Sequence, residues 1–234
     1  IKEVNTNTTI VAPDDVKQQT IGEARFLRAY AYFNLVRFFG RVPLIDTLFS
    51  DPAAQNNIPQ STAAQIYAFI EADLNFAASV LPMQWGSQFA GRVTKGSANG
   101  LLAKVYLTQQ KWAQAMAVAN EVMNSGQYNL STPYDRIFRE DGENSKESVF
   151  EVQATATAAI PSALGVQYAQ IQGVRGPGLW DLGWGWNSPS ELLANAYEPN
   201  DPRRVRTILF TSTPTTPGLT IYGETTPTGL PNPR

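Results

Sequence analysis

The spacing of apolar residues predicts four helices in the first half of the chain. Between about residues 14 and 39, apolar side chains recur every three or four positions, which is typical of a helix with a buried stripe. The predicted stripe consists of Ala24, Leu27, Ala31, Leu35 and Phe38. Phe26, Tyr30 and Phe33 widen it, so we expect this helix to be buried on most of its sides.

A second helix is expected to begin at Ser61 or Thr62, because either hydroxyl can cap a helix N-terminus, and to end before Pro82. The side chains predicted to form its apolar face are Ile66, Ile70, Leu74, Ala77 and Ala78.

The third and fourth helices form the clearest pair. Thr94 is the expected N-cap of the third, and a short break near Gln109 and Gln110 separates it from the fourth, which Gly126 ends as a left-handed residue. The predicted apolar face of the third helix consists of Ala98, Leu101, Leu102, Val105 and Tyr106, and that of the fourth of Trp112, Ala115, Met116, Ala119, Val122 and Met123. This pair looks like a tetratricopeptide unit, and the first two helices are a candidate second copy, which predicts a stacked helical layer.

The second half of the chain has a different character. Residues 148–153 alternate like a short strand, 160–190 are rich in Gly, Pro and Trp, and a short helix is predicted over 189–197. Thr, Pro and Gly dominate from Thr211 onward, which predicts extended loop. We therefore expect one mainly α domain over 1–234, with a tetratricopeptide-like helical part at about 14–130 and a loop-rich part with short strands at about 131–234.

Composition excludes several classes of function. The chain contains no Cys and no His, which excludes Cys/His zinc sites and Ser-His-Asp or Cys-His catalysis. Its net charge of −2 provides no basic field for a nucleic-acid backbone. Oxygen ligands for calcium occur over 141–144, but without EF-hand spacing, so we expect neither a metal nor a cofactor.

The residues that best fit a ligand site are tryptophans in glycine-rich loops. Sugar rings stack their C–H faces on indoles, while carboxylates and amides bind the hydroxyl edge. The candidate ligand-binding residues are Trp180, Asp181, Trp184, Trp186 and Asn187 in one loop and Trp85 in another. The alternative is that Trp180 and Trp184 plug the loops onto the helices and that Trp85 anchors a helix end. Trp186, between Gly185 and Asn187, is the strongest candidate for exposure, whereas Trp112 is expected in the core.

Five ordered motifs carry a resemblance to a known family. They are GEARFLRAYAYFNLVRFFG at 22–40 followed by VPL at 42–44, GRVTKG at 91–96 with LLAKVYL at 101–107, SGQYNL at 125–130, ESVFEV at 147–152 and DPRR at 201–204. Together they resemble the SusD/RagB family of nutrient-binding lipoproteins. Ligand residues vary within that family, so the candidate tryptophans rest on composition alone.

The resemblance implies a tetratricopeptide-like scaffold with an irregular ligand face, exposed on the outer membrane of a Bacteroidetes-type bacterium. It implies capture of an oligosaccharide or other nutrient for a SusC-like TonB-dependent transporter. It also implies an anchoring lipid on an N-terminal Cys. Because the chain contains no Cys, we expect the lipid-bearing residue to lie outside it, and the chain to be an internal piece of a longer protein.

Two other functions are weighed against a non-enzymatic binding protein. A glycoside hydrolase needs two carboxylates, one with a raised pKa, and the acidic residues nearest each other are Glu140, Asp141, Glu143 and Glu147. Their polar neighbours predict a solvated turn. A pure scaffold would use the helical layer only to dock a partner protein.

Overall fold

The computed structural model describes residues 1–47, 53, 57–154, 167–176, 178–210, 218, 220 and 223–226. The chain forms two compact units: unit 1 comprises residues 1–132 and 140–151, and unit 2 comprises residues 133–139 and 152–234. The predicted organisation as one domain stays a prediction. The extended loop predicted from Thr211 onward lies largely outside the described residues.

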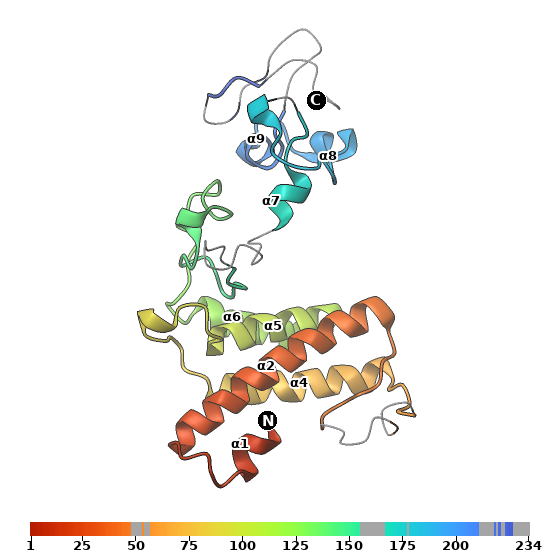
Figure 1. Cartoon of the computed structure of the whole chain (residues 1–234), viewed down its shortest axis with the longest axis vertical. Helices are drawn as coiled ribbons and strands as arrows, with labels where there is room; N and C mark the ends of the chain where they lie inside the picture. Colours follow the sequence, from red (N-terminus) through yellow and green to blue (C-terminus); the bar gives the residue numbers. More distant parts are fainter. Residues whose placement is uncertain are drawn as a thin grey trace. The chain divides into compact units, whose positions relative to one another are not determined.

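Unit 1 is built from helices (Figure 1). Its α-helices are α1 (Lys2–Thr6), α2 (Asp14–Phe39), α4 (Ala63–Val80), α5 (Lys95–Thr108) and α6 (Trp112–Met123), and its short 3₁₀ turns are η1 (Ser87–Phe89) and η2 (Glu140–Gly142). α2 packs on α4, α4 on α5, and α5 on α6. The prediction of a mainly α fold with tetratricopeptide-like helix pairs is confirmed.

Local sequence sets the beginnings of two of these helices. The Thr62 side chain accepts a hydrogen bond from the Gln65 amide, and the Gln65 side chain accepts one from the Thr62 amide. Thr94 and Ser97 form the same reciprocal arrangement at the start of α5. Such a box satisfies backbone donors that a helix N-terminus otherwise leaves unpaired. Both N-caps are therefore as the sequence predicts.

α2 and α4 run antiparallel, and a buried carboxylate joins them. Arg28 of α2 donates to both carboxylate oxygens of Asp73 at 2.7 and 2.8 Å, and Arg25 lies 3.8 Å from the same carboxylate. Asp73 is only 2 % exposed. Further along α2, Tyr32 packs edge-on against Phe69 at 5.5 Å between ring centroids. Two arginines of α2 thus share one buried carboxylate of α4.

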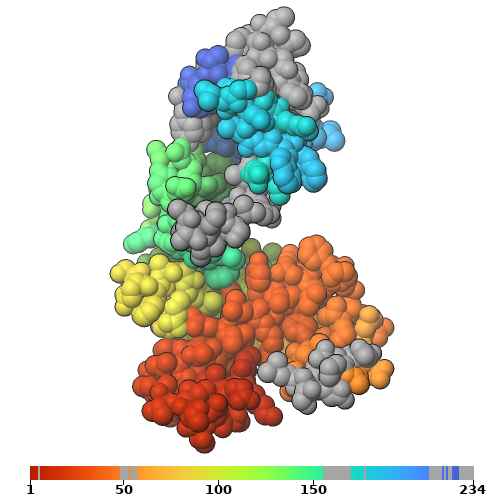
Figure 2. All heavy atoms as spheres, in the orientation of Figure 1, coloured from red at the N-terminus to blue at the C-terminus, as the bar shows by residue number. Residues whose placement is uncertain are grey.

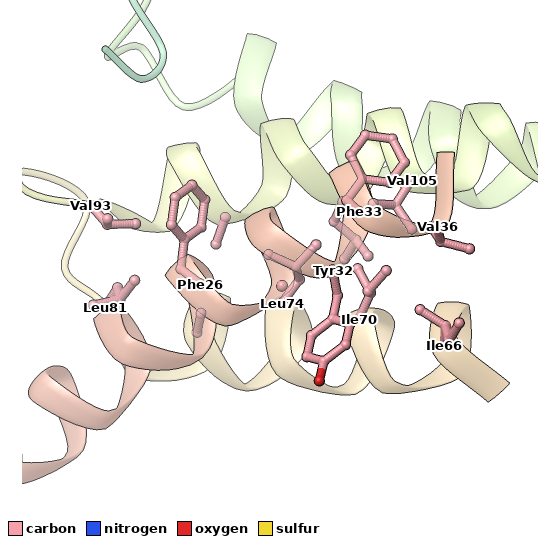
Figure 3. Packing of buried hydrophobic residues seen from close by; sticks show 14 residues of the cluster. Phe26, Tyr32, Phe33, Val36, Ile66, Ile70, Leu74, Leu81, Val93 and Val105 are labelled. Atoms are coloured by element: carbon pink, nitrogen blue, oxygen red, sulfur yellow. The ribbon is translucent and has the colours of Figure 1, made fainter. Parts of the chain in front are cut away.

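The core of unit 1 lies where α2, α4 and α5 meet. Figure 3 shows side chains of α2 and α4 pointing toward one another, with Val105 and Val93 beside them. Ile66, Ile70 and Leu74 are completely buried, as the period of the second helix predicts. In α5, Ala98, Leu102 and Val105 are buried, whereas Leu101 and Tyr106 lie at the edge of the core.

The buried face of α2 differs from the predicted stripe. Leu27 is 56 %, Leu35 37 % and Phe38 77 % exposed, while Ala29 and Val36 are buried. The α2 residues that form the core are Ile21, Phe26, Ala29, Tyr32, Phe33 and Val36. The helix carries apolar residues around much of its circumference, so periodicity alone did not identify the face that meets α4.

α6 is also less buried than predicted. Ala115 is buried, but Trp112 is 61 %, Met116 64 % and Met123 65 % exposed. The expectation that Trp112 belongs to the core is wrong. Among the described helices, α6 packs chiefly on α5, and much of its broad apolar surface is exposed.

The strand predicted over 148–153 is also wrong. The described residues contain no strands, and their isolated bridges include one between Val42 and Ser61 and one between Arg175 and Asp181. The carbonyl of Val149 accepts a hydrogen bond from the Ser97 hydroxyl, and Phe150 packs edge-on against Phe26. This segment pairs with helix side chains instead of a neighbouring strand.

Unit 2 consists of short helices and loops. Its helices are α7 (Gln167–Gln172), η3 (Gly178–Trp180), α8 (Glu191–Ala196) and α9 (Pro202–Thr207). α8 confirms the short helix predicted over 189–197, with Ser190 as its N-cap. Asp201 caps α9 by accepting from the Arg203 amide, and it also pairs with the Arg203 side chain. Arg203 therefore has a local ion pair, whereas Arg206 pairs with Asp135, which lies far away in the sequence.

Candidate functional site

The candidate tryptophans of unit 2 lie on a loop that is tied to α7 through its backbone. The amides of Leu182 and Gly183 both donate to the carbonyl of Val174, at 2.9 and 3.1 Å. The Trp184 amide donates to the Gln170 carbonyl at 2.8 Å. Two further amides, those of Gly185 and Trp186, donate to the carbonyls of Gly173 and Ile171, each at 2.9 Å. We call residues 178–187 the Gly/Trp loop.

Two glycines allow this close approach, each for a different reason. A Cβ added to Gly183 would overlap the carbonyl oxygen of Gln170 and lie 2.8 Å from the Cα of Gly173. Gly185 has φ of +69°, a left-handed conformation that side chains disfavour. The sequence shows only that the loop is rich in glycine, whereas the packing of Gly183 depends on its contact with Gln170 and Gly173 in the fold.

The anchored loop presents two indoles to solvent. Trp184 is 51 % and Trp186 63 % exposed. Their ring centroids lie 5.8 Å apart with planes inclined at 58°. Both indoles belong to unit 2, and the segment that carries them is cyan to light blue in Figure 2. The pair forms a two-faceted aromatic surface whose position is fixed by the backbone.

The other three candidates of this loop flank the two indoles in the sequence. Trp180 is half-buried, whereas Asp181 and Asn187 are exposed. The Asp181 amide donates to the Gly178 carbonyl at 3.1 Å, and Asn187 takes a left-handed conformation with φ of 56°. The structure thus brings five of the six candidate residues into one loop. Their role in binding stays a prediction.

Trp85, the sixth candidate, belongs to unit 1. Its indole N–H donates to the Val93 carbonyl at 2.8 Å, and the Arg92 guanidinium carbon lies 3.7 Å from its ring centroid. Arg92 also donates through Nε and Nη2 to both carboxylate oxygens of Glu23, at 2.9 and 2.8 Å. These hydrogen bonds raise the pKa of Arg92 above its usual value. The half-buried indole is therefore held in place on one face and at its N–H.

A cleft of about 510 Å³ opens beside Trp85 within unit 1. Its walls include Arg92, Thr94, Tyr128 and the segment 144–146. Sequence reasoning found Trp85 but missed the other wall residues. Arg92 and Tyr128 lie 36 positions apart, so no local spacing predicts that they share a site.

The acidic turn shows no arrangement for hydrolysis. Glu140, Asp141 and Glu143 are exposed around η2 and lack an apolar setting. Among the residues that the structure describes, no group of three or more acidic side chains is placed to hold a metal ion. In the same part of the chain, no helix is both long and apolar enough to cross a bilayer.

Comparison with known proteins gives a consistent result. Residues 2–107 match the SusD-like family described as "Starch-binding associating with outer membrane". The chain is 29% identical over 216 residues to SusD-like protein P2 of Formosa agariphila, an alignment that covers 88% of this chain and 42% of that protein. It is 32% identical over 167 residues to a SusD-like protein of Bacteroides ovatus, covering 65% of this chain and 29% of that protein. The chain therefore spans less than half the length of these relatives.

Solved structures agree with the sequence matches. A SusD-like protein from Bacteroides fragilis superimposes with a TM-score of 0.71 at 29% identity, covering 84% of this chain and 38% of that one. Surface glycan-binding protein A from Bacteroides thetaiotaomicron, in complex with laminarihexaose, gives a TM-score of 0.71 at 26% identity, covering 87% of this chain and 44% of that one. The motifs, the helical unit and these matches agree, and together they support a protein of the SusD/RagB family.

Proposed function

We propose that this protein binds oligosaccharides at the cell surface and that the Gly/Trp loop is its glycan platform. The observation that carries the proposal is the pair of exposed indoles, Trp184 and Trp186, on a loop anchored by five backbone hydrogen bonds. A surface that is already ordered before binding loses little conformational entropy when a ligand arrives.

The geometry of the pair suits a sugar chain. A pyranose ring offers an apolar C–H face to an indole, and its hydroxyl edge takes hydrogen bonds from groups such as Asp181 and Asn187. Because the two indole planes are inclined at 58°, the pair fits a chain whose successive rings are rotated relative to each other. Stacking plus a few hydrogen bonds predicts a dissociation constant of about 10 μM to 1 mM, or roughly −4 to −7 kcal/mol.

The named relatives support binding without catalysis. They include the starch-binding protein SusD of Bacteroides thetaiotaomicron and a laminarin-binding SusD-like protein. In the proposed function no covalent bond of the ligand is made or broken, and the contacts serve only to hold the ligand. The exposed setting of Glu140, Asp141 and Glu143 favours this over a glycoside hydrolase, whose acid needs a raised pKa.

The proposal extends to location and partner. The description of the matching family as associating with the outer membrane supports a place at the surface of that membrane. We further propose that the longer protein is anchored by an N-terminal lipid and delivers its glycan to a SusC-like TonB-dependent transporter.

Affinity electrophoresis through gels containing a panel of polysaccharides, laminarin and starch among them, tests the platform. The test variant replaces Trp180, Trp184 and Trp186 with Ala. The matched control is Trp112→Ala, which removes an indole of similar exposure (61 %) from α6 of unit 1. We expect at least one polysaccharide to retard the wild type and the control, while the triple variant migrates freely.

Other outcomes select other functions. If the triple variant is retarded as strongly as the wild type, the Gly/Trp loop is not the platform. If no polysaccharide retards the wild type, a scaffold that docks a partner protein becomes the better account. If oligosaccharides are shortened during incubation, the protein is a hydrolase and the proposal is wrong.

A further inference from the structure

The cleft beside Trp85 has the features of a second carbohydrate site. It lies wholly within unit 1, between the loop that precedes α5, the first turn of α5 and the segments around Tyr128 and 144–151. The loop before α5 belongs to the surface of unit 1, yellow in Figure 2. Its volume of about 510 Å³ falls within the range of about 300–1,000 Å³ that small-molecule sites occupy.

One wall holds a preorganised donor. The guanidinium carbon of Arg92 lies over the Trp85 indole, 3.7 Å from the ring centroid, and Glu23 accepts hydrogen bonds from Nε and Nη2. Nη1 is not engaged by any described residue, so it keeps two N–H donors in a fixed orientation. An arginine held this way loses little side-chain entropy when it donates to a sugar hydroxyl.

A second wall presents hydroxyl groups. The Tyr128 hydroxyl lies 3.1 Å from the Thr94 hydroxyl, which also caps α5. This contact depends on Gly96, because a Cβ there would lie 2.6 Å from the Tyr128 ring. A hydroxyl both donates and accepts, so this pair can match either polarity of a sugar hydroxyl.

A third wall supplies an acceptor. The Glu151 carboxylate accepts hydrogen bonds from the Ser148 hydroxyl and from the backbone N–H of Asn144. These bonds fix the carboxylate, which has further lone pairs for a ligand. Donor, hydroxyl and acceptor groups thus surround one cleft that has an indole in its wall.

The charges indicate which glycans fit. Glu23 forms an ion pair with Arg92, and the lining holds one further cation, Lys146, and one carboxylate, Glu151, so these four formal charges sum to zero. The cleft therefore offers no net positive charge to a uronic or sulfated sugar. We propose that it is a second subsite of unit 1, which binds a short stretch of neutral oligosaccharide independently of the Gly/Trp loop. This inference takes only its ligand class, oligosaccharides, from the proposed function.

Nuclear magnetic resonance of the indole N–H groups tests the subsite in the 234-residue chain. The probes are laminarihexaose, maltohexaose, cellohexaose and xylohexaose, with a trigalacturonate as the acidic comparison. Signals are assigned by single Trp→Phe variants. We expect at least one neutral probe to shift the Trp85 signal saturably, with trigalacturonate weaker and the Trp112 signal unmoved.

Two kinds of variant connect the shift to the cleft. Tyr128→Phe keeps the ring against Gly96 and removes only the hydroxyl, so the dissociation constant read at Trp85 is expected to rise about three- to tenfold. The double variant Trp184→Ala, Trp186→Ala is expected to leave the Trp85 response unchanged. Melting temperature verifies that each variant is folded.

The outcomes separate this inference from the proposed function. Shifts at Trp184 and Trp186 without a shift at Trp85 overturn the subsite and leave the platform in place. A shift at Trp85 alone supports the subsite and overturns the platform. If no neutral probe moves Trp85, or if Tyr128→Phe binds like the wild type, the subsite is wrong.

Discussion

The anchoring of the Gly/Trp loop predicts a large effect from a single methyl group. In Gly183→Ala, the added Cβ would overlap the Gln170 carbonyl oxygen and approach the Gly173 Cα to 2.8 Å. Both are backbone atoms, so neither moves aside as a flexible side chain would. We expect the part of the loop around Gly183, residues 182–184, to detach from α7, because lifting this part relieves the overlap.

The expected loss of affinity follows from the backbone hydrogen bonds that the substitution breaks. Three amides, those of Leu182, Gly183 and Trp184, donate to α7 or the residues just after it at 2.8–3.1 Å around the overlap. Each of these hydrogen bonds contributes a net value of about 1 kcal/mol, so losing the three of them destabilises the docked loop by about 3 kcal/mol. If glycan binding requires the docked loop, the affinity falls about 100-fold, because each 1.4 kcal/mol is a factor of ten.

Isothermal titration calorimetry with the polysaccharide that retards the wild type measures this loss. Gly178→Ala is the matched control in the same loop. Its Cβ meets nothing within 4 Å, and its φ of +60° costs about 1 kcal/mol, which predicts at most about a tenfold loss. An affinity for Gly183→Ala within threefold of the wild type would refute the anchoring argument.

Two further predictions concern ion pairs. Asp73→Ala leaves Arg25 and Arg28 without their buried partner and is expected to lower the free energy of unfolding of unit 1 by about 2–4 kcal/mol, read by far-UV circular dichroism in urea. Hydrogen bonds from the side chain and amide of Arg203 hold the pKa of Asp201 below its ordinary value, so the stabilisation is present above that ordinary value and is lost as the pH falls through the lowered pKa. Carboxyl-carbon titration by nuclear magnetic resonance should place the Asp201 midpoint below that of a model peptide, and Arg203→Gln should raise it.

Each of these predictions has a clear contrary result. Glu71→Gln breaks a more exposed pair with Lys111 and is expected to cost less than about 1 kcal/mol. If Asp73→Ala costs no more than this control, the Asp73 pair is not a principal contact of unit 1. An Asp201 midpoint that Arg203→Gln leaves unchanged would show that the ion pair does not form in solution.

The sequence by itself determined the elements whose signals are local. The helix predicted over about 14–39 is observed at Asp14–Phe39, and the caps at Thr62 and Thr94 are the predicted residues. Helix periods and hydroxyl caps act within a few residues, so they can be read without knowing the fold. The ordered motifs indicated the family for a similar reason, since each is a contiguous segment.

Tertiary structure decided which face of each helix is buried and which distant residues meet. Leu27 and Phe38 recur at helical spacing as Phe26 and Phe33 do, yet only the second pair is buried in the core. Trp112 on α6 is exposed, and Phe150 packs on α2 instead of joining a strand. The cleft depends on Arg92, Tyr128 and Glu151 meeting across long stretches of chain. Periodicity records that a residue is apolar or polar, but burial and shared sites depend on long-range packing, which a local pattern does not contain.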